Sequence, residues 1–276
     1  MMRPTCWVWS EVAMSSWLKT SAVVLVALAF SVSAQGQNGQ AGGSRGNRDA
    51  TAPPTAQLPF DPHDFSGIWV EHGGAFNSLS ANPPAMTVWG KERYDAAKPG
   101  IGPRAQPLGN DPIMTCEPIG YPRVAFYNAY PMEFVQTKDR IVEFFDFFYT
   151  HRTIYLDGRK LPDDPEPTWY GYSVGRWDGN VLVVETIGFN DQSWLDNDGH
   201  PHSDQMRLEE RFQRVDRDTI ESTMTLTDPK TYTAPWRSDK KTWKLTPKSK
   251  MREDLCAPSD EDAYRKDMRE PAAKKH

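Results

Sequence analysis

The chain has 276 residues, of which 38% are hydrophobic, 25% charged and 12% aromatic, a composition that supports a packed core and excludes outright disorder. Its 23 prolines and 19 glycines leave few uninterrupted stretches, which argues against a helical bundle, a coiled coil and a doubly wound α/β fold. Its 32 basic and 37 acidic residues give a net charge of -5, which argues against nucleic-acid binding and against a polybasic membrane surface.

The first 34 residues have the features of an export signal. Lys19 precedes an apolar run at 22–30, and Val32, Ser33 and Ala34 form the small-residue pattern at which signal peptidases cut. The run is about half of the ~20 residues that cross a bilayer. We therefore predict a signal peptide at 1–34, no membrane span after its cleavage, and a periplasmic or secreted protein. Translation from Met1 and from Met14 both fit this pattern.

Residues 35–59 are mostly Gly, Gln, Asn, Ser, Ala and Pro, with hardly any apolar side chain. Such a segment cannot bury surface and is predicted to be a disordered linker, so the folded domain is expected at 60–276. Cys116 and Cys256 remain after signal cleavage. In an exported chain two cysteines predict one disulfide, and two buried thiols are the alternative.

Helices are predicted to be minor. Thr87 can cap a short helix through Trp89 and Tyr94 that ends by Lys98, because Pro99 follows. Residues 99–131 contain seven prolines and are expected to form an extended strap on the rest of the fold. A second helix is predicted at the C-terminus, with Ser259 as its N-cap, an end near Arg269 and Pro271 beyond that end.

Between residues 132 and 245, turn signals such as Asp157-Gly158 and Asp178-Gly179 recur at short intervals between runs rich in β-branched and aromatic residues. This pattern is typical of consecutive antiparallel hairpins. Alternation is clearest at 206–213 and 220–226, where one face is apolar and the other polar. About eight such strands hide their edges most simply by closing into an antiparallel up-and-down β-barrel, with a β-sandwich as the alternative.

Several segments resemble known proteins. Phe65-Ser-Gly-Ile-Trp69 resembles the Gly-x-Trp start of lipocalin-like barrels. More specific are RTIYLDGR at 152–159, WYGYSVGRW at 169–177, GFNDQSWLD at 188–196, GHPHSD at 199–204 and DPKTYTAPW at 228–236. Together they resemble a large family of exported bacterial proteins without an assigned activity. The resemblance covers nearly the whole chain after the linker and implies a lipocalin-like fold and export, but no reaction.

The segment Gly171-Tyr-Ser173-Val-Gly175 matches the Gly-x-Ser-x-Gly nucleophile elbow of serine hydrolases. That elbow requires a helix directly after the serine. A hairpin-like sequence follows Ser173 instead, so we interpret the match as part of a strand.

A possible metal site lies around His200 and His202, with Asp196, Asp198 and Asp204 nearby. Two imidazoles close to carboxylates can hold zinc or another divalent ion. The same residue types also suit a hydrogen-bonded structural loop. No cofactor is therefore predicted, and a divalent metal at this loop is kept as the alternative.

Polar residues on apolar faces form the strongest candidate site. Glu210 shares a face with Leu208 and Phe212, and Glu185 shares one with Val183 and Ile187. A buried carboxylate must be paired or protonated, and the available partners are Arg152, Arg176 and Arg211. The two interpretations are an internal ion pair that fixes strand register and a polar patch that moves protons on a ligand.

Strand alternation along residues 141–156 predicts which of their side chains point toward that patch. His151 and Tyr149 are in phase with Phe145 and Phe147, whereas Arg152 has the opposite parity unless a bulge intervenes.

We expect an exported barrel that binds a small, largely apolar or aromatic molecule. If it is an enzyme, His202 or Glu210 acts as general base and Arg152 stabilises negative charge, as in a lyase, isomerase or hydrolase. The predicted ligand-contacting residues are His151, Tyr172, Trp177, Asn190 and Trp194. The alternatives are a non-catalytic ligand-binding or structural periplasmic protein, and a metal-dependent enzyme that uses the loop of His200 and His202. The oligomeric state is left open.

Overall fold

The computed structural model describes residues 59–73, 77–127 and 130–274. The predicted signal peptide (1–34) and residues 35–58 of the predicted linker lie outside the described residues. Within the described part of the chain, no helix is both long enough and apolar enough to cross a membrane.

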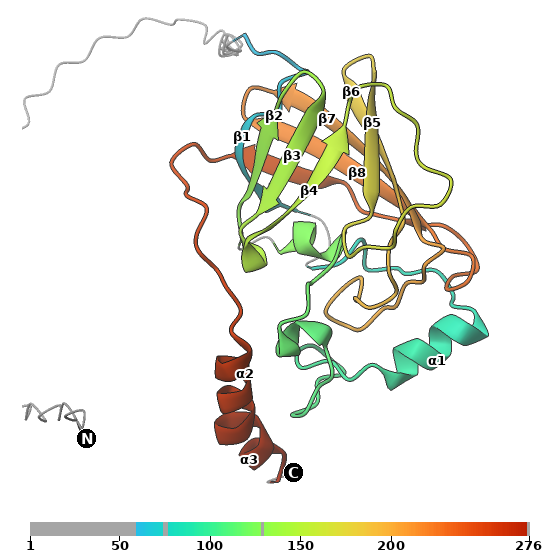
Figure 1. Ribbon diagram of the computed structural model, residues 1–276, viewed down its shortest axis with the longest axis vertical. Coiled ribbons are helices and arrows are strands. Elements are labelled where there is room, and N and C mark those ends of the chain that lie inside the picture. Colours follow the sequence, from blue (N-terminus) through green and yellow to red (C-terminus); the bar gives the residue numbers. More distant parts are fainter. Residues whose placement is uncertain (1–58, 74–76, 128–129, 275–276) are drawn as a thin grey trace, which may run out of the picture. The chain divides into compact units, whose positions relative to one another are not determined.

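A closed barrel of nine strands dominates the described chain (Figure 1). Strands β1 to β8 are neighbours in chain order, and β10 pairs with both β8 and β1, which closes the barrel. The short β9 adds to β8. This confirms the predicted mainly β barrel, with nine strands instead of about eight, and rules out the β-sandwich alternative. The strands are β1 (Gly67–His72), β2 (Met132–Gln136), β3 (Arg140–Phe145), β4 (Thr150–Tyr155), β5 (Tyr172–Asp178), β6 (Val181–Ile187), β7 (Arg207–Asp216), β8 (Thr219–Thr227), β9 (Trp236–Arg237) and β10 (Lys241–Leu245).

One strand pair departs from the predicted antiparallel arrangement. Strands β4 and β5 are parallel, with Ile154 opposite Ser173 and Tyr155 opposite Val174. A parallel pair needs a connection that carries the chain back along the barrel. Residues 156–171, which contain Pro162, make that connection. The strictly up-and-down prediction is therefore wrong at this pair.

Alternating residues line the barrel interior. In β7 the side chains of Leu208, Glu210 and Phe212 are buried between exposed neighbours, as the alternation predicts. At one level of the interior, the rings of Phe65, Phe134 and Phe212 have their centroids 6.1–6.4 Å apart. Trp69 is fully buried, and its Nε1 donates to the carbonyl of Phe65 at 2.9 Å. Packed side chains therefore occupy the interior at this level.

Short helices and 3₁₀ segments lie between the strands and at the C-terminal end of the described chain. Helix α1 (Val88–Ala96) is capped by Thr87, whose side chain accepts from the Gly90 N–H at 3.1 Å. Three short 3₁₀ segments follow, η1 (Pro112–Thr115), η2 (Arg123–Phe126) and η3 (Phe147–Tyr149). The predicted disulfide is present: Cys116 and Cys256 are bonded, with their Cα atoms 5.5 Å apart. It joins the segment after η1 to the segment before the C-terminal helices.

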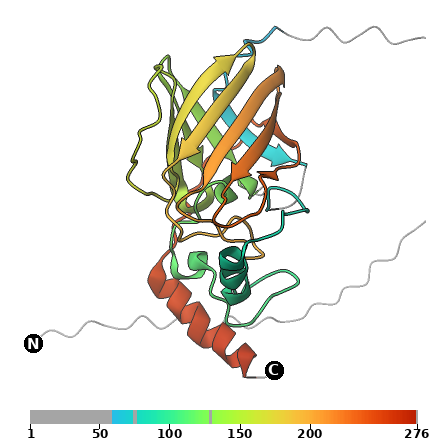
Figure 2. The same ribbon diagram turned by 90° about the vertical axis from the view of Figure 1, so that its right-hand side faces the viewer.

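The C-terminal helical segment differs from its prediction. It runs through α2 (Pro258–Tyr264), the π-helical η4 (Arg265–Arg269) and α3 (Glu270–Ala273), drawn as one continuous helix in Figure 2. Ala257, not Ser259, occupies the N-cap, because Pro258 takes a first-turn position where its missing N–H is not needed. Pro271 lies inside the segment and not beyond its end, at a first-turn position of α3 directly after the π-helical turn.

Candidate functional site

A buried ionic network crosses the barrel interior. Arg152 on β4 donates from Nη1 to Glu210 Oε2 at 2.7 Å and from Nη2 to Glu210 Oε1 at 3.0 Å. Its Nε donates to Glu143 on β3, and its Nη2 donates to the hydroxyl of Tyr121 at 2.8 Å. Tyr121 in turn donates to Glu210. All four residues are at most 3% exposed, so strands β3, β4 and β7 are joined through one guanidinium.

The network is crowded with negative charge. Two carboxylates share one arginine, and Glu143 Oε1 has no hydrogen-bond partner among the described residues. Burial raises the pKa of Glu143 to about 7, against the opposing effect of Arg152. Burial also raises the pKa of the Tyr121 hydroxyl, which therefore stays a donor. Arg152 and Glu210, two predicted catalytic residues, are together, and their hydrogen bonds go to each other and to Tyr121 and Glu143.

A turn in the chain explains why Arg152 faces inward. Residues 141–156 do not form one strand: β3 ends at Phe145, and η3 intervenes before β4. Phe148 and Tyr149 have φ of 56° and 47°, and this left-handed pair resets the alternation. Arg152 is therefore buried opposite Glu143, whereas His151 is exposed on the outer wall, where its ring lies 5.6 Å from that of Phe144. The predicted inward facing of His151 is wrong.

Glu185 also faces outward, contrary to prediction. The buried residues of β6 are Leu182, Val183, Val184 and Thr186. Three of these four have the parity opposite to that of Glu185, and this parity faces the interior. Glu185 instead accepts from Arg176 Nη1 at 2.6 Å in an exposed ion pair.

The remaining predicted ligand residues are spread over the fold. The ring of Tyr172 stacks on Tyr155 at 5.3 Å, and its hydroxyl accepts from Arg159 at 3.1 Å. Trp177 contacts the rings of Phe65 and His63. Two others lie in the loop after β6: Asn190, whose Oδ1 accepts from the Gln192 N–H, and Trp194, which lies 5.8 Å from the Arg123 guanidinium. None of the five predicted residues lines the cleft described below.

The hydrogen-bond partners of His202 are residues outside the ionic network. The residue is 1% exposed, and its Nε2 lies 2.8 Å from Ser193 Oγ. Burial lowers the pKa of His202, which keeps the ring neutral. His200 has a different partner: its Nδ1 lies 2.6 Å from Asp196 Oδ2. Among the described residues, no group of three or more His, Cys, Asp or Glu side chains is arranged to hold a metal ion.

Ser173 is not a nucleophile elbow. It is buried on β5 and its Oγ lies 2.9 Å from Thr186 Oγ1. Strand β6 follows where the elbow requires a helix.

A cleft of about 550 Å³ lies between three segments that are far apart in the sequence. We call it the strap cleft, after the proline-rich strap that forms one wall. The strap contributes the apolar residues Ile101 and Pro103 together with Arg104, and the other segments contribute mostly polar side chains. The lining residues are Asn77, Ser78, Tyr94, Ile101, Gly102, Pro103, Arg104, Asp196, Asn197 and Asp198.

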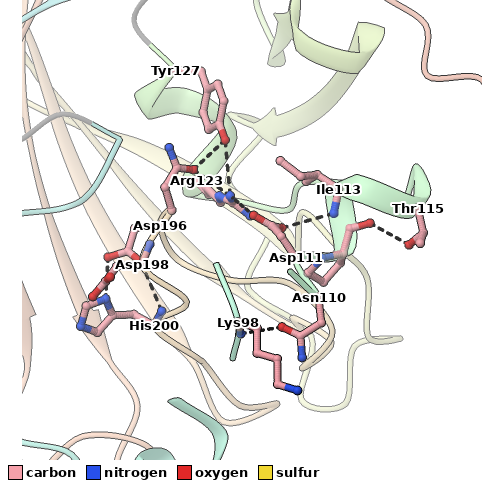
Figure 3. Close-up of polar contacts among 12 residues, drawn as sticks. Lys98, Asn110, Asp111, Ile113, Thr115, Arg123, Tyr127, Asp196, Asp198 and His200 are labelled. Atoms are coloured by element: carbon pink, nitrogen blue, oxygen red, sulfur yellow. Dashed lines mark hydrogen bonds and ion pairs between the residues drawn. The ribbon is translucent and has the colours of Figure 1, made fainter. Parts of the chain in front are cut away.

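The strap residues of the cleft lie in a loop whose two ends, Lys98 and Asn110, are hydrogen-bonded to each other. The Asn110 N–H donates to the carbonyl of Lys98 at 2.9 Å, and Asn110 Oδ1 accepts from the Lys98 N–H at 2.6 Å (Figure 3). Arg104 donates to the carbonyls of Asp198 and Tyr94, both at 2.7 Å, and to that of Ala97 at 3.1 Å. Its guanidinium also lies 3.8 Å above the Tyr94 ring. The hydrogen bonds and the ring contact of Arg104 therefore link the strap to the C-terminal end of α1.

The opposite wall is the turn from Asp196 to His200. Asp196 accepts from the N–H groups of Asp198 and His200 at 2.9 and 3.2 Å, and from Ser78 Oγ at 3.2 Å. Burial alone would raise the pKa of Asp196, but hydrogen bonds, chiefly from His200, hold it below its ordinary value. Asp198 accepts from the Tyr94 hydroxyl, which ties this turn to α1. Figure 3 shows Asp196, Asp198 and His200 gathered in this turn.

A second buried ion pair, between Arg123 and Asp111, fixes the position of Asn197 in this turn. Arg123 donates to both oxygens of Asp111 at 2.9 and 2.6 Å. Asn197 Oδ1 accepts from Arg123 and from the Tyr127 hydroxyl, both at 2.7 Å. Figure 3 shows Arg123 between Asp111 and Tyr127. The position of Asn197 in the cleft wall is therefore fixed by η2.

One polar side chain of the strap cleft is buried without a partner. Asn77 is 5% exposed, and its Oδ1 accepts no hydrogen bond from any described residue. A buried acceptor in this state costs about 1–3 kcal/mol. The carboxylate of Asp198 is therefore an acceptor in the lining of the cleft, and Asn77 adds a buried acceptor that no described residue satisfies.

Comparison with models of protein families, with curated proteins and with solved structures gave no match for this chain.

Proposed function

We propose that the protein is an exported β-barrel that binds a small molecule in the strap cleft and does not convert it. The observation that carries the proposal is the cleft itself. It has the volume of a small-molecule site, about 550 Å³, and it combines apolar side chains with a few positioned polar groups, as such sites do.

The burial of the predicted catalytic residues supports binding over catalysis. His202, Glu210 and Arg152 are at most 3% exposed. A general base must come within hydrogen-bond reach of its substrate. The partners of these three side chains are protein groups, so we assign them a role in the stability of the barrel.

The lining of the strap cleft supports a ligand with an apolar body and at least one hydrogen-bond donor. Ile101 and Pro103 offer apolar surface from the strap, and Ile101 is 58% exposed. Asp198 and Asn77 offer acceptors from the other walls. This keeps the predicted small, largely apolar ligand but moves it from the barrel interior to the strap.

Export is supported by the disulfide and by the sequence. Disulfides persist in oxidising compartments and are rare in the cytosol, and Cys116 and Cys256 are bonded. The apolar run at 22–30 and the resemblance to exported bacterial proteins support the same location.

Fluorescence titration of the full chain with 9-anthracenemethanol tests the binding proposal. This probe is neutral, has an apolar body and carries one hydroxyl donor. We expect saturable binding that Ile101→Trp abolishes, because the larger side chain fills the strap wall of the cleft. The matched control is Val135→Trp, which enlarges an exposed apolar residue on β2 that is 43% exposed. The proposal is wrong if the probe does not bind, or if both variants weaken its binding equally.

A further inference from the structure

The two carboxylates of the strap cleft differ in the number of hydrogen bonds that they accept. Asp196 is buried and accepts from two backbone N–H groups, from Ser78 and from the ring of His200. Asp198 is only partly buried, and within the described residues its side chain takes a single hydrogen bond, from the Tyr94 hydroxyl to Oδ2. Asp198 is therefore the carboxylate with accepting capacity left for a ligand.

The two arginines near the cleft, Arg104 and Arg123, donate to groups other than the Asp198 carboxylate. Arg104 donates to three backbone carbonyls, including that of Asp198 but not its carboxylate. Arg123 forms a two-bond pair with Asp111. The charge of the Asp198 carboxylate thus has no direct cationic partner among the described residues, and the residue is partly buried in the cleft wall. Such a carboxylate favours a cationic donor, because charge-assisted hydrogen bonds are the stronger kind.

Asn77 provides an independent observation that favours the same ligand chemistry. The residue lines the same cleft, and its Oδ1 is a buried acceptor without a partner among the described residues. A protonated amine has several N–H donors and no acceptor. It can satisfy both the carboxylate and the amide oxygen, whereas an anionic ligand brings only acceptors to groups that need donors.

We propose that the strap cleft selects small molecules that carry a protonated amine on an apolar body, with Asp198 as the pairing carboxylate and Asn77 as a second acceptor. This inference rests on the proposed function, because it names the class of ligand for the same cleft. Ile101 and Pro103 contact the apolar body, and the amine is directed toward the turn from Asp196 to His200.

Three anthracene probes of equal ring size test the inference on the full chain. They are 9-(aminomethyl)anthracene, which is cationic at neutral pH, 9-anthracenemethanol, which is neutral, and 9-anthracenecarboxylate, which is anionic. We expect the amine to bind about fivefold more tightly than the alcohol, the factor that an ion pair worth about 1 kcal/mol contributes, and the carboxylate to bind most weakly. The advantage of the amine should shrink at high salt.

Asp198→Asn tests the assigned residue. Asparagine can still accept from Tyr94, but it has no charge, so the ratio of the alcohol and amine dissociation constants should fall to about one. The control is Asp191→Asn, which removes an exposed carboxylate of the same loop that pairs with Arg93 and should leave the ratio unchanged. Equal binding of all three probes by the unmodified protein overturns the inference and leaves the proposed function standing. Failure of every probe to bind overturns both. An unchanged ratio in a folded Asp198→Asn variant overturns the role of Asp198.

Discussion

Replacement of Arg152 by methionine tests whether the internal network holds the barrel together. The guanidinium donates to Glu143, to both oxygens of Glu210 and to Tyr121, and it lies 3.6 Å from the Tyr121 ring centroid. Methionine fills much of the same space, but it leaves two buried carboxylates without their shared cation. Tyr121 can still donate to Glu210, so the loss falls mainly on Glu143.

The expected loss of stability is large. Removal of one partner from a buried ion pair costs about 3–5 kcal/mol, because an uncompensated buried charge remains. In a domain of about 200 residues, each 1 kcal/mol lowers the melting temperature by about 2–4 °C. The product of the two ranges predicts a melting temperature about 6–20 °C below that of the parent protein.

Thermal and urea unfolding, followed by circular dichroism with the disulfide intact, measures this loss. The matched control is Arg176→Met, which removes the exposed pair with Glu185 at the outer wall and should cost about 0–1 kcal/mol. Equal losses in the two variants would refute the structural role of the network. A triple variant that also replaces Glu143 and Glu210 by apolar residues should regain much of the stability, because no buried charge is left.

Two further predictions concern titration and the disulfide. The pKa of Glu143 is about 7 when folded, against an ordinary value of 4.5, so the folded chain binds this proton more tightly than the unfolded chain. Its stabilisation is full below about pH 4.5 and is lost as the pH rises to about 7. Glu143→Gln cannot titrate and should show a smaller decline in urea midpoint over this range; parallel pH profiles of variant and parent would contradict this assignment. Joint replacement of Cys116 and Cys256 by serine removes a cross-link that spans 140 positions and should cost about 2–5 kcal/mol. Reduction of the parent protein should lower its melting temperature to that of the variant, and an unchanged temperature would show that the cross-link does not stabilise the fold.

Alternation predicted the strands where one face is core and the other is solvent. In β7 and β8 the residues expected to face inward are buried, because a period of two follows directly from strand geometry. The parallel pairing of β4 with β5 could not be predicted in this way. Local turn signals indicate that the chain turns within residues 156–171, but the strand beside which it resumes is decided by contacts distant in sequence.

The inward position of Arg152 shows the limit of alternation more sharply. Phe147, Phe148 and Tyr149 are residue types that favour strands, and their sequence predicts that the strand continues. The turn is stabilised from outside: the buried carboxylate of Asp146 accepts from the backbone and the guanidinium of Arg252. A partner 106 positions away leaves no local signal, so the left-handed conformations of Phe148 and Tyr149 could not be foreseen.

The strap cleft was predicted only in part for the same reason. The turn from Asp196 to His200 was a candidate because of its residue types. Asn77 and Arg104, on the other walls, belong to no motif, and their place in the cleft follows from the packing of the strap against α1 and the barrel. A search of the sequence for Asp, Asn and Arg near turn residues would have found them together with many others of no consequence.

Hydrogen-bond partners distinguish the polar residues that hold this fold from those with unused accepting capacity better than residue type does. Asp196 and Asp198 are two positions apart, are both carboxylates and both line the strap cleft. Asp196 has donors from Ser78, His200 and the backbone, so a ligand would compete with bonds that already hold the turn. Asp198 has one donor, and the nearby Arg104 is engaged by carbonyls. Since a bound molecule gains most where the protein has left an acceptor unmatched, this difference in partners is the reason for proposing Asp198, and not Asp196, as the ligand-pairing carboxylate.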